Sequence, residues 1–112
     1  MPVPRLKRVY EAPAGDDGMR VLVDRLWPRG LSKDKARIDL WLKDIAPSDA
    51  LRREFHAHPD RWGDFRAAYR AELDGNQALG ELKSLARQRK VTLLFAARDP
   101  EHNNAVVLKE LL

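Results

Sequence analysis

The stretch Val91–Ala97 (VTLLFAA) narrows the choice of folds most, because seven consecutive uncharged residues lie between two charged neighbours. A continuous apolar strand is buried on both faces, which is typical of a central strand in an α/β sheet. Met19–Asp24 (MRVLVD) is short and rich in β-branched residues, so it predicts a second buried strand. Helical segments separate these two strands along the chain, and we therefore expect them to be parallel. Arg5–Tyr10 (RLKRVY) shows alternation and predicts a half-exposed strand.

The segments between the strands show helical periodicity. Lys35–Ile45 predicts a helix, because its apolar residues fall at i, i+3, i+4 and i+7, and Ser48 predicts the N-cap of a short helix over Asp49–Ala57. Asp99–Pro100–Glu101 predicts the start of a last helix, with Asp as N-cap and Pro in the first turn. Two further helices follow from the stripes Trp62, Phe65, Tyr69, Leu73 and Leu79, Leu82, Leu85, Ala86. We expect a small single α/β domain over residues 1–112, with four to five helices flanking a mainly parallel sheet of about three strands.

Composition excludes several classes of protein. The chain has 112 residues and no cysteine, so disulfides, thiolate catalysis and cysteine-bound metals are excluded. No apolar run approaches the ~18 residues of a spanning helix, so no membrane partner is expected, and the start of the chain shows no signal peptide, which predicts a cytoplasmic location. No metal site is predicted, because His56, His58 and Asp60 lie close together without a matching further ligand.

The positive charge is uneven along the chain. Lys and Arg number 21 against 17 Asp and Glu, a net charge of +4. Residues 1–38 hold 9 basic and 5 acidic side chains and so carry the whole excess, whereas residues 39–112 hold 12 of each. Fourteen of the cations are Arg, whose planar fork suits phosphate or carboxylate. A codon bias towards Arg explains the same count equally well.

Ligands of an open α/β sheet bind beyond the carboxyl ends of its strands. The loops Asp24–Gly30 and Arg98–Asn104 follow the two buried strands, so we expect Arg25, Arg29 and Arg98 to converge beside the N-terminus of the last helix, where an anion is favoured. The candidate ligand-binding residues are Asp24, Arg25, Trp27, Arg29, Arg98, Asp99, His102 and Asn103.

Most of these residues also have a purely structural interpretation. Asp24 is suited to capping a turn or pairing with Arg25, and Trp27 to covering the core. Arg98 is suited to pairing with Asp99 or Glu101. The other candidates, Arg29 and His102, are compatible with solvated surface positions. Such charge clusters occur in structural networks as well as in functional sites.

The strings DRLWPRG and AARDPEHNN, in the order and spacing found here, resemble the short, YeaO-like branch of the DUF488 family. The resemblance runs from about Leu6 to Leu112. It implies no activity or cofactor, because the family has no assigned function. It does imply that the candidate residues of the two loops are those that the short branch keeps.

Longer DUF488 proteins differ at two points. They place cysteines in the last strand and the following loop, and the corresponding residues here are Phe95, Asn103, Asn104 and Ala105, so thiol or metal chemistry does not transfer. In the longer proteins a helix joins the first two strands, which implies a parallel first strand. Here a loop of about eight residues makes that connection, so the direction of the first strand stays open.

Three functions remain at this stage. The favoured one is binding of a small anionic ligand, phosphorylated or nucleotide-like, at the carboxyl edge of the sheet, with or without catalysis. A nucleic-acid-binding or regulatory module is the alternative, although the central helices carry no net positive charge. A structural or interaction role, for example as a homodimer, is the third.

Overall fold

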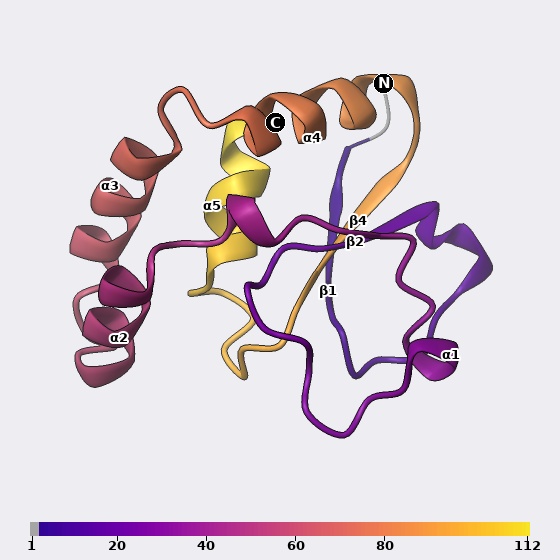
Figure 1. Ribbon diagram of the computed structural model, residues 1–112, viewed down its shortest axis with the longest axis horizontal. Helices are drawn as coiled ribbons and strands as arrows, with labels where there is room; N and C mark the ends of the chain where they lie inside the picture. The colour runs from indigo at the N-terminus through magenta and orange to yellow at the C-terminus, as the bar shows by residue number, and fades with distance from the viewer. Residues whose placement is uncertain (1–2) are drawn as a thin grey trace.

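The computed structural model of the chain describes residues 3–112. The strands are β1 (Arg5–Arg8), β2 (Met19–Leu22), β3 (Leu40–Trp41) and β4 (Val91–Phe95). The helices are two 3-10 turns, η1 (Gly15–Asp17) and η2 (Lys43–Ile45), and α1 (Lys33–Ala36), α2 (Asp49–Ala57), α3 (Trp62–Leu73), α4 (Gln77–Gln88) and α5 (Asn104–Leu111). All four strands are parallel and lie in the order β1-β4-β2-β3 (Figure 1). The α/β class is confirmed, with one strand more than the expected three.

Strand β4 is central, as its apolar sequence predicts. All five of its residues are buried, and it pairs with β1 on one side and β2 on the other. Leu93 lies between Leu6 and Val21 in this register. The parallel pairing of β1 with β4 settles the direction of the first strand.

The two faces of the sheet bury different segments. Val21 and Leu93 face a large core formed with α3, α4 and α5. Their neighbours Leu22 and Leu94 face a smaller core with Val9, covered by partly buried side chains of the long segment between β2 and β3. Successive side chains of each strand thus point alternately into a helical layer and into a layer of loop and short helix.

The predicted helix over Lys35–Ile45 is wrong. Helix α1 ends at Ala36, because Arg37 is left-handed (φ 46°), and Leu40–Trp41 then pairs with β2 as strand β3. The apolar residues of this segment recur at helical spacing, but they pack on opposite faces of the sheet. Ile38 and Trp41 pack against the smaller core, whereas Leu42 and Ile45 belong to the larger one.

The predicted start of the last helix at Asp99–Pro100–Glu101 is also wrong. Helix α5 begins at Asn104, with Asn103 as its N-cap. Asp99 instead closes a turn, because its Oδ1 accepts hydrogen bonds from the backbone N–H of Glu101 at 2.9 Å and of His102 at 3.3 Å. Both Asp and Asn favour such positions, and the buried side chain of Asn103 takes the cap.

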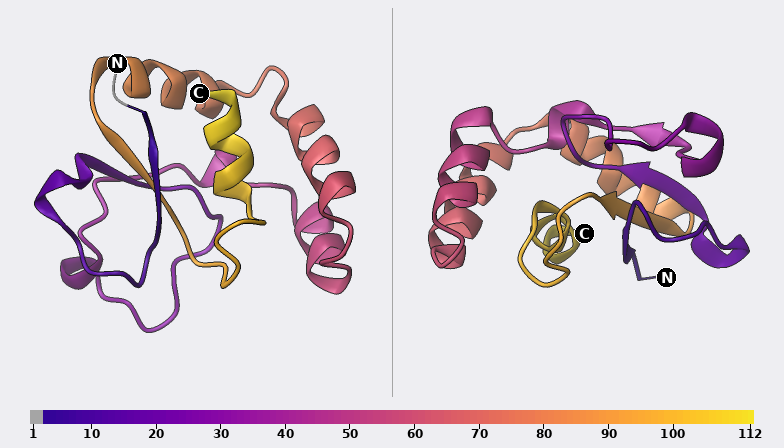
Figure 2. Two further views of the ribbon diagram at one scale, coloured as in Figure 1. Left: turned by 180° about the vertical axis from the view of Figure 1, so that it is seen from behind. Right: turned by 90° about the horizontal axis from the view of Figure 1, so that it is seen from below.

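The helical hairpin of α2 and α3 lies to one side of the sheet (Figures 1 and 2). Side chains from α3, the start of α4 and the loop after β2 hold the linker Asp44–Ser48 that leads into it. These contacts are Asn76 Nδ2 to Asp44 O, Tyr69 Oη to Ile45 O, Arg25 Nη2 to Ala46 O, and Ser48 N and Oγ to the Glu72 carboxylate. Ser48 also caps α2, as predicted. Across residues 3–112, every helix is too short or too polar to span a bilayer.

Candidate functional site

Asp24 joins the carboxyl ends of β2 and β4. Its Oδ2 accepts a hydrogen bond from the backbone N–H of Ala96 at 2.8 Å, and its Oδ1 accepts one from Asn104 Nδ2 at 3.1 Å. Burial raises the pKa of this carboxyl, although the two donors act in the opposite direction. Asp24 therefore fixes the loop after β4 and the start of α5 relative to β2.

Arg25 is half-buried and turns towards the linker before α2. Its Nη2 donates a long bond of 3.4 Å to the carbonyl of Ala46. Its Nε is buried and has no hydrogen-bond partner among residues 3–112. Beside it, burial and the negative charge of Asp24 raise the pKa of Tyr69. Arg25 is therefore a half-buried cation whose Nε has no partner among the described residues and whose Nη2 makes only one long hydrogen bond.

Trp27 packs against the smaller core and is not a free stacking platform. Its Nε1 donates to the carbonyl of Leu31 at 2.7 Å, and its ring meets that of Trp41 edge-on at 5.4 Å. Trp41 Nε1 in turn donates to the carbonyl of Asp24 at 2.7 Å. The two indoles thereby hold the loop after β2 against the sheet.

Arg29 and Arg98 are exposed. The segments that carry them are connected through Arg8, a residue that the sequence analysis did not identify as a candidate. Arg8 Nε and Nη2 donate to the carbonyls of Ala97 and Ala96 at 3.0 and 3.2 Å. Its guanidinium lies 5.1 Å from the Tyr10 ring, whose hydroxyl donates to the carbonyl of Arg29 at 3.1 Å. Arg8 ends β1 at this edge only because β1 is parallel, and the sequence left that direction open.

Asp99 and His102 form a pair on the loop after β4. Asp99 Oδ2 lies 2.9 Å from His102 Nδ1, and the backbone N–H of Glu101 together with His102 holds the pKa of Asp99 below its usual range. The His102 ring packs 5.0 Å from the ring of Trp62 on α3. The remaining candidate, Asn103, is buried and donates to the carbonyl of Asp99 at 2.9 Å.

Contacts therefore bring the candidate residues into two groups. Asp24 and Arg25 lie on the side of α3, with Tyr69 and Asn104. The segments that carry Arg29 and Arg98 are joined through Arg8 and Tyr10. Convergence of the Arg25, Arg29 and Arg98 guanidiniums on one ligand stays a prediction.

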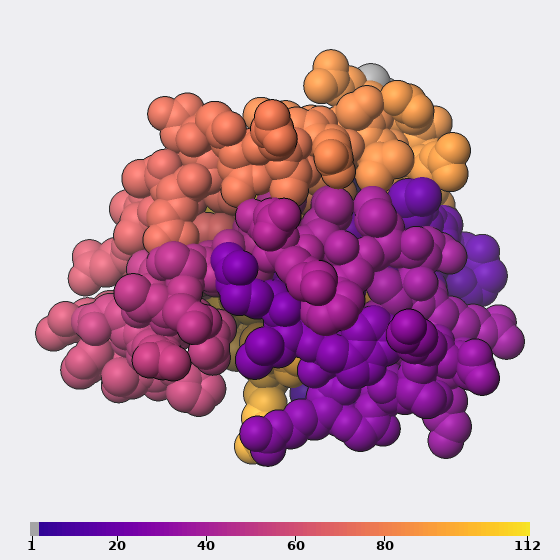
Figure 3. Space-filling view, viewed as in Figure 1, coloured from indigo at the N-terminus to yellow at the C-terminus, as the bar shows by residue number. Residues whose placement is uncertain are grey.

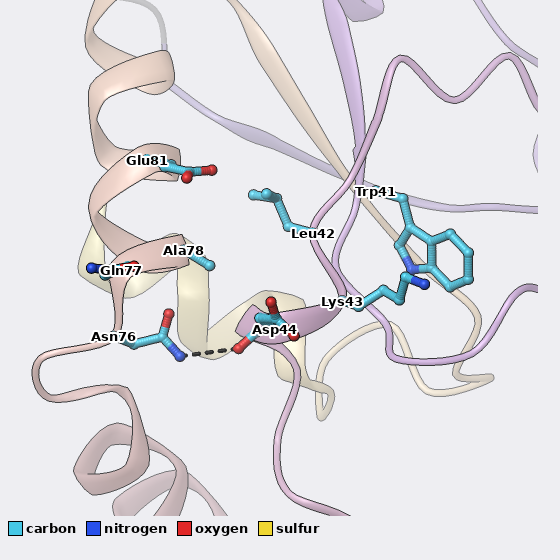
Figure 4. Close-up of a pocket in the computed structure, with 8 residues that line it drawn as sticks. All are labelled: Trp41, Leu42, Lys43, Asp44, Asn76, Gln77, Ala78 and Glu81. Atoms are coloured by element: carbon cyan, nitrogen blue, oxygen red, sulfur yellow. Dashed lines mark hydrogen bonds between the residues drawn. The ribbon is translucent and has the colours of Figure 1, made fainter.

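Two surface pockets of the described residues lie away from these loops. The larger, of about 400 Å³, lies between η2 and the start of α4 (Figure 4). Glu81 stands on the α4 wall, and Asn76 bonds to the carbonyl of Asp44 opposite. The smaller, of about 310 Å³, lies beside β1 and η1. Neither pocket is lined by any of the candidate residues.

Comparison with known proteins places the chain in a family. Residues 4–112 match the family model described as the inactive DUF488-N3 subclade. The chain is 45% identical over 108 residues to uncharacterised proteins of Mycobacterium tuberculosis and Mycobacterium bovis, covering 96% of this chain and 92% of each relative. It is 42% identical over 107 residues to the uncharacterised protein YeaO of Escherichia coli, covering 95% and 93%. No solved structure matches. The chain therefore belongs to the DUF488 family, in the subclade described as inactive.

Proposed function

We propose that the carboxyl edge of the sheet binds a small phosphate-bearing anion and does so without catalysing a reaction. The observation that carries this proposal is the state of Arg25. Its guanidinium is half-buried, its Nε is buried without a partner among the described residues, and its Nη2 makes only one long bond. A buried donor without a partner is costly, and a phosphate oxygen is the kind of acceptor that would satisfy it once the Arg25 side chain turns to meet the anion.

The carboxylates at this edge leave the arginines available. Asp24 is engaged by Ala96 N–H and Asn104, and Asp99 is engaged by the loop N–H groups and His102. Glu11, after β1, accepts from the backbone N–H of Arg8 at 2.7 Å. Among residues 3–112 no carboxylate lies within ion-pair distance of the four arginines of this edge, which are Arg8, Arg25, Arg29 and Arg98.

Bidentate hydrogen bonds from Arg25 and from the exposed Arg98 are the contacts that we assign to the anion. Binding without chemistry agrees with the description of the subclade as inactive. It also agrees with the absence of cysteine at the positions where longer relatives carry it.

The test is a thermal-shift titration with inorganic phosphate and with nucleoside mono- and triphosphates at constant ionic strength. A ligand at ten times its Kd stabilises the fold by about 1.4 kcal/mol, which raises Tm by several degrees. Arg98→Gln and Arg25→Lys should each reduce that rise, whereas Arg53→Gln, a change of an exposed arginine on α2, should leave it intact. A flat titration with every anion, or equal losses in Arg98→Gln and Arg53→Gln, would overturn the proposal.

A further inference from the structure

Because all four strands are parallel, the segments that lead into them gather at one edge of the sheet, which we call the amino edge. It comprises residues 14–20 before and within β2, 33–39 before β3, and 83–90 before β4, together with Arg5 and Lys7 of β1. These segments touch one another. Arg5 and Lys7 pair with Asp16 and Asp17 of η1 at 2.8 and 3.2 Å, and Gly18 packs against Lys90.

Further contacts join α1 to the same edge. Arg20 Nη2 donates to the carbonyl of Ala36 at 3.0 Å, and the backbone N–H of Arg20 donates to Asp39 at 2.8 Å. The front and back views agree that η1, α1 and the end of α4 lie along the rim of the molecule remote from α2 and α3 (Figures 1 and 2).

The amino edge carries more than the whole net charge of the chain. It holds 10 cationic and 4 anionic side chains, a net charge of +6. The remaining 11 cationic and 13 anionic side chains carry −2, and the two parts sum to the +4 of the whole chain. Residues 83–90 contribute four cations and no acid.

Three of the four acids of the amino edge, Asp16, Asp17 and Asp39, are engaged within it, and the fourth, Asp34, is exposed and makes no ion pair within residues 3–112. Asp16 pairs with Arg5, and Asp17 pairs with both Lys7 and Arg20. Asp39 accepts from the backbone of Arg20. Seven cations of this edge have no ion-pair partner within residues 3–112, and all are exposed or half-exposed: Lys33, Lys35, Arg37, Lys83, Arg87, Arg89 and Lys90.

We propose that the amino edge binds the phosphate backbone of double-stranded nucleic acid, independently of sequence and independently of the anion site at the other edge. A positive, solvent-facing surface on which cations outnumber acids by 10 to 4 is the electrostatic signature of such binding. Figure 3 shows the end of α4 (orange) and the segment around η1 and α1 (indigo to magenta) reaching the surface on the same side of the molecule.

The composition of this edge favours a duplex over other acidic partners. Residues 14–20, 33–39 and 83–90 contain no aromatic side chain, so they offer no platform on which bases of a single strand can stack. They also present none of the exposed large apolar residues of the described chain, which are Val3, Tyr10 and Leu26. Protein interfaces usually need such anchors at their centre.

Fluorescence anisotropy with a labelled mixed-sequence duplex, titrated from low to moderate salt, tests the proposal. We expect log Kobs to fall linearly with log salt, with a slope of about −0.9 for each phosphate neutralised. Arg87→Gln/Arg89→Gln removes two of the exposed cations, so the slope should become shallower by about 2 and the affinity at low salt should fall about 100-fold. The matched control is Arg52→Gln/Arg53→Gln on α2, which removes the same charge from two exposed arginines and should change the affinity far less.

Several results would overturn it. One is a flat anisotropy curve at the lowest salt, and another is an equal loss of affinity in the two double variants, which would indicate a response to net charge alone. Tighter binding of single-stranded DNA would contradict the duplex assignment. Equal binding of polyglutamate at matched charge and salt would point to an acidic protein partner instead. Circular dichroism of both variants, expected to match the parent, excludes loss of fold as the cause.

Discussion

Replacing Arg20 by Met should destabilise the fold far more than removing any surface cation. Arg20 is 3% exposed, and its guanidinium donates to Asp17 Oδ2 at 2.5 Å, to the carbonyl of Ala36 at 3.0 and 3.3 Å, and to that of Arg37 at 3.2 Å. Methionine keeps the apolar stem but none of these donors. The variant therefore leaves a buried carboxylate and two backbone acceptors without the partner they share.

The cost can be worked from these contacts. Breaking a buried ion pair from one side costs about 3–5 kcal/mol. Asp17 keeps Lys7 at 3.2 Å and the N–H of Ala14 at 3.0 Å, which places the ion-pair loss at the lower end. The orphaned carbonyls add about 1 kcal/mol or more. We expect a total near 4 kcal/mol, a large part of the ~5–15 kcal/mol that stabilises a domain.

Urea denaturation followed by circular dichroism measures this loss as a fall in the midpoint at unchanged slope. Arg5→Met is the matched control, because Arg5 also pairs with an aspartate of η1 at 2.8 Å, but both side chains are more than half exposed. Its midpoint should barely move. A loss below about 1 kcal/mol for Arg20→Met would refute the view that this buried pair holds α1 and β3 in place.

At acid pH the difference in stability between Arg20→Met and the parent should become smaller. Burial by itself raises the pKa of Asp17, but the N–H of Ala14 together with Arg20 and Lys7 holds that pKa below its ordinary value of 3.8. A carboxyl with a lowered folded pKa contributes stability above its unfolded pKa and loses it as the pH falls through the folded value. The urea midpoints of the two proteins should therefore approach each other below about pH 4.

Three further changes have defined outcomes. Gly18→Ala should cost about 2 kcal/mol or more in urea denaturation, because φ is +67° and a Cβ would lie 2.4 Å from the carbonyl oxygen of Lys90, whereas Gly80→Ala on α4 meets nothing within 4 Å and should not destabilise. Asn103→Ala should remove the α5 cap and cost about 1–2 kcal/mol, seen as a lower Tm. Burial raises the pKa of Asp24 in the folded chain above its ordinary value of 3.8. Ionisation of this carboxyl therefore lowers the stability of the fold as the pH rises from the ordinary pKa to the raised one. The urea midpoint of Asp24→Asn relative to the parent should therefore rise as the pH increases above 3.8, and a constant difference would contradict the raised pKa.

Elements with a local signal could be predicted from the sequence. Val91–Phe95 is a buried central strand because every residue in it is apolar or small enough to be buried on either face. Helix α2 has the predicted bounds, because Ser48 caps it and proline residues flank it. Helix α3 follows the same logic, with a stripe of apolar residues on one side.

Elements determined by distant contacts could not be predicted. The helical periodicity of residues 35–45 misleads, because the chain crosses from one core to the other within that segment. The helix ends at the left-handed Arg37, and Arg20, 16 and 17 residues earlier in the chain, donates hydrogen bonds to the carbonyls of Ala36 and Arg37 that a continuing helix would use internally. No pattern within residues 35–45 records that interaction.

The candidate site could be predicted only in part, because some of its contacts also depend on segments distant in the sequence. Strand ends and topology placed the two loops at one edge, and Asp24 indeed joins them through Ala96. The inward turn of Arg25 depends on the linker near Ala46, and the packing of His102 depends on Trp62 of α3. Both partners belong to segments whose position follows from tertiary packing, so loop sequence alone does not specify them.

The excess positive charge is distributed differently along the sequence and in the folded chain. By sequence, residues 1–38 carry the whole excess of +4 and residues 39–112 are balanced. In the folded chain Lys90, the last of the four cations of 83–90, packs against Gly18 after η1, because β4 starts next to β2, and the excess collects at the amino edge. A parallel sheet always gathers the segments before its strands at one edge and the loops after them at the other. The two edges can thus bind different phosphate-bearing ligands, because one has a diffuse positive surface and the other has individually placed arginines among carboxylates that are already hydrogen-bonded.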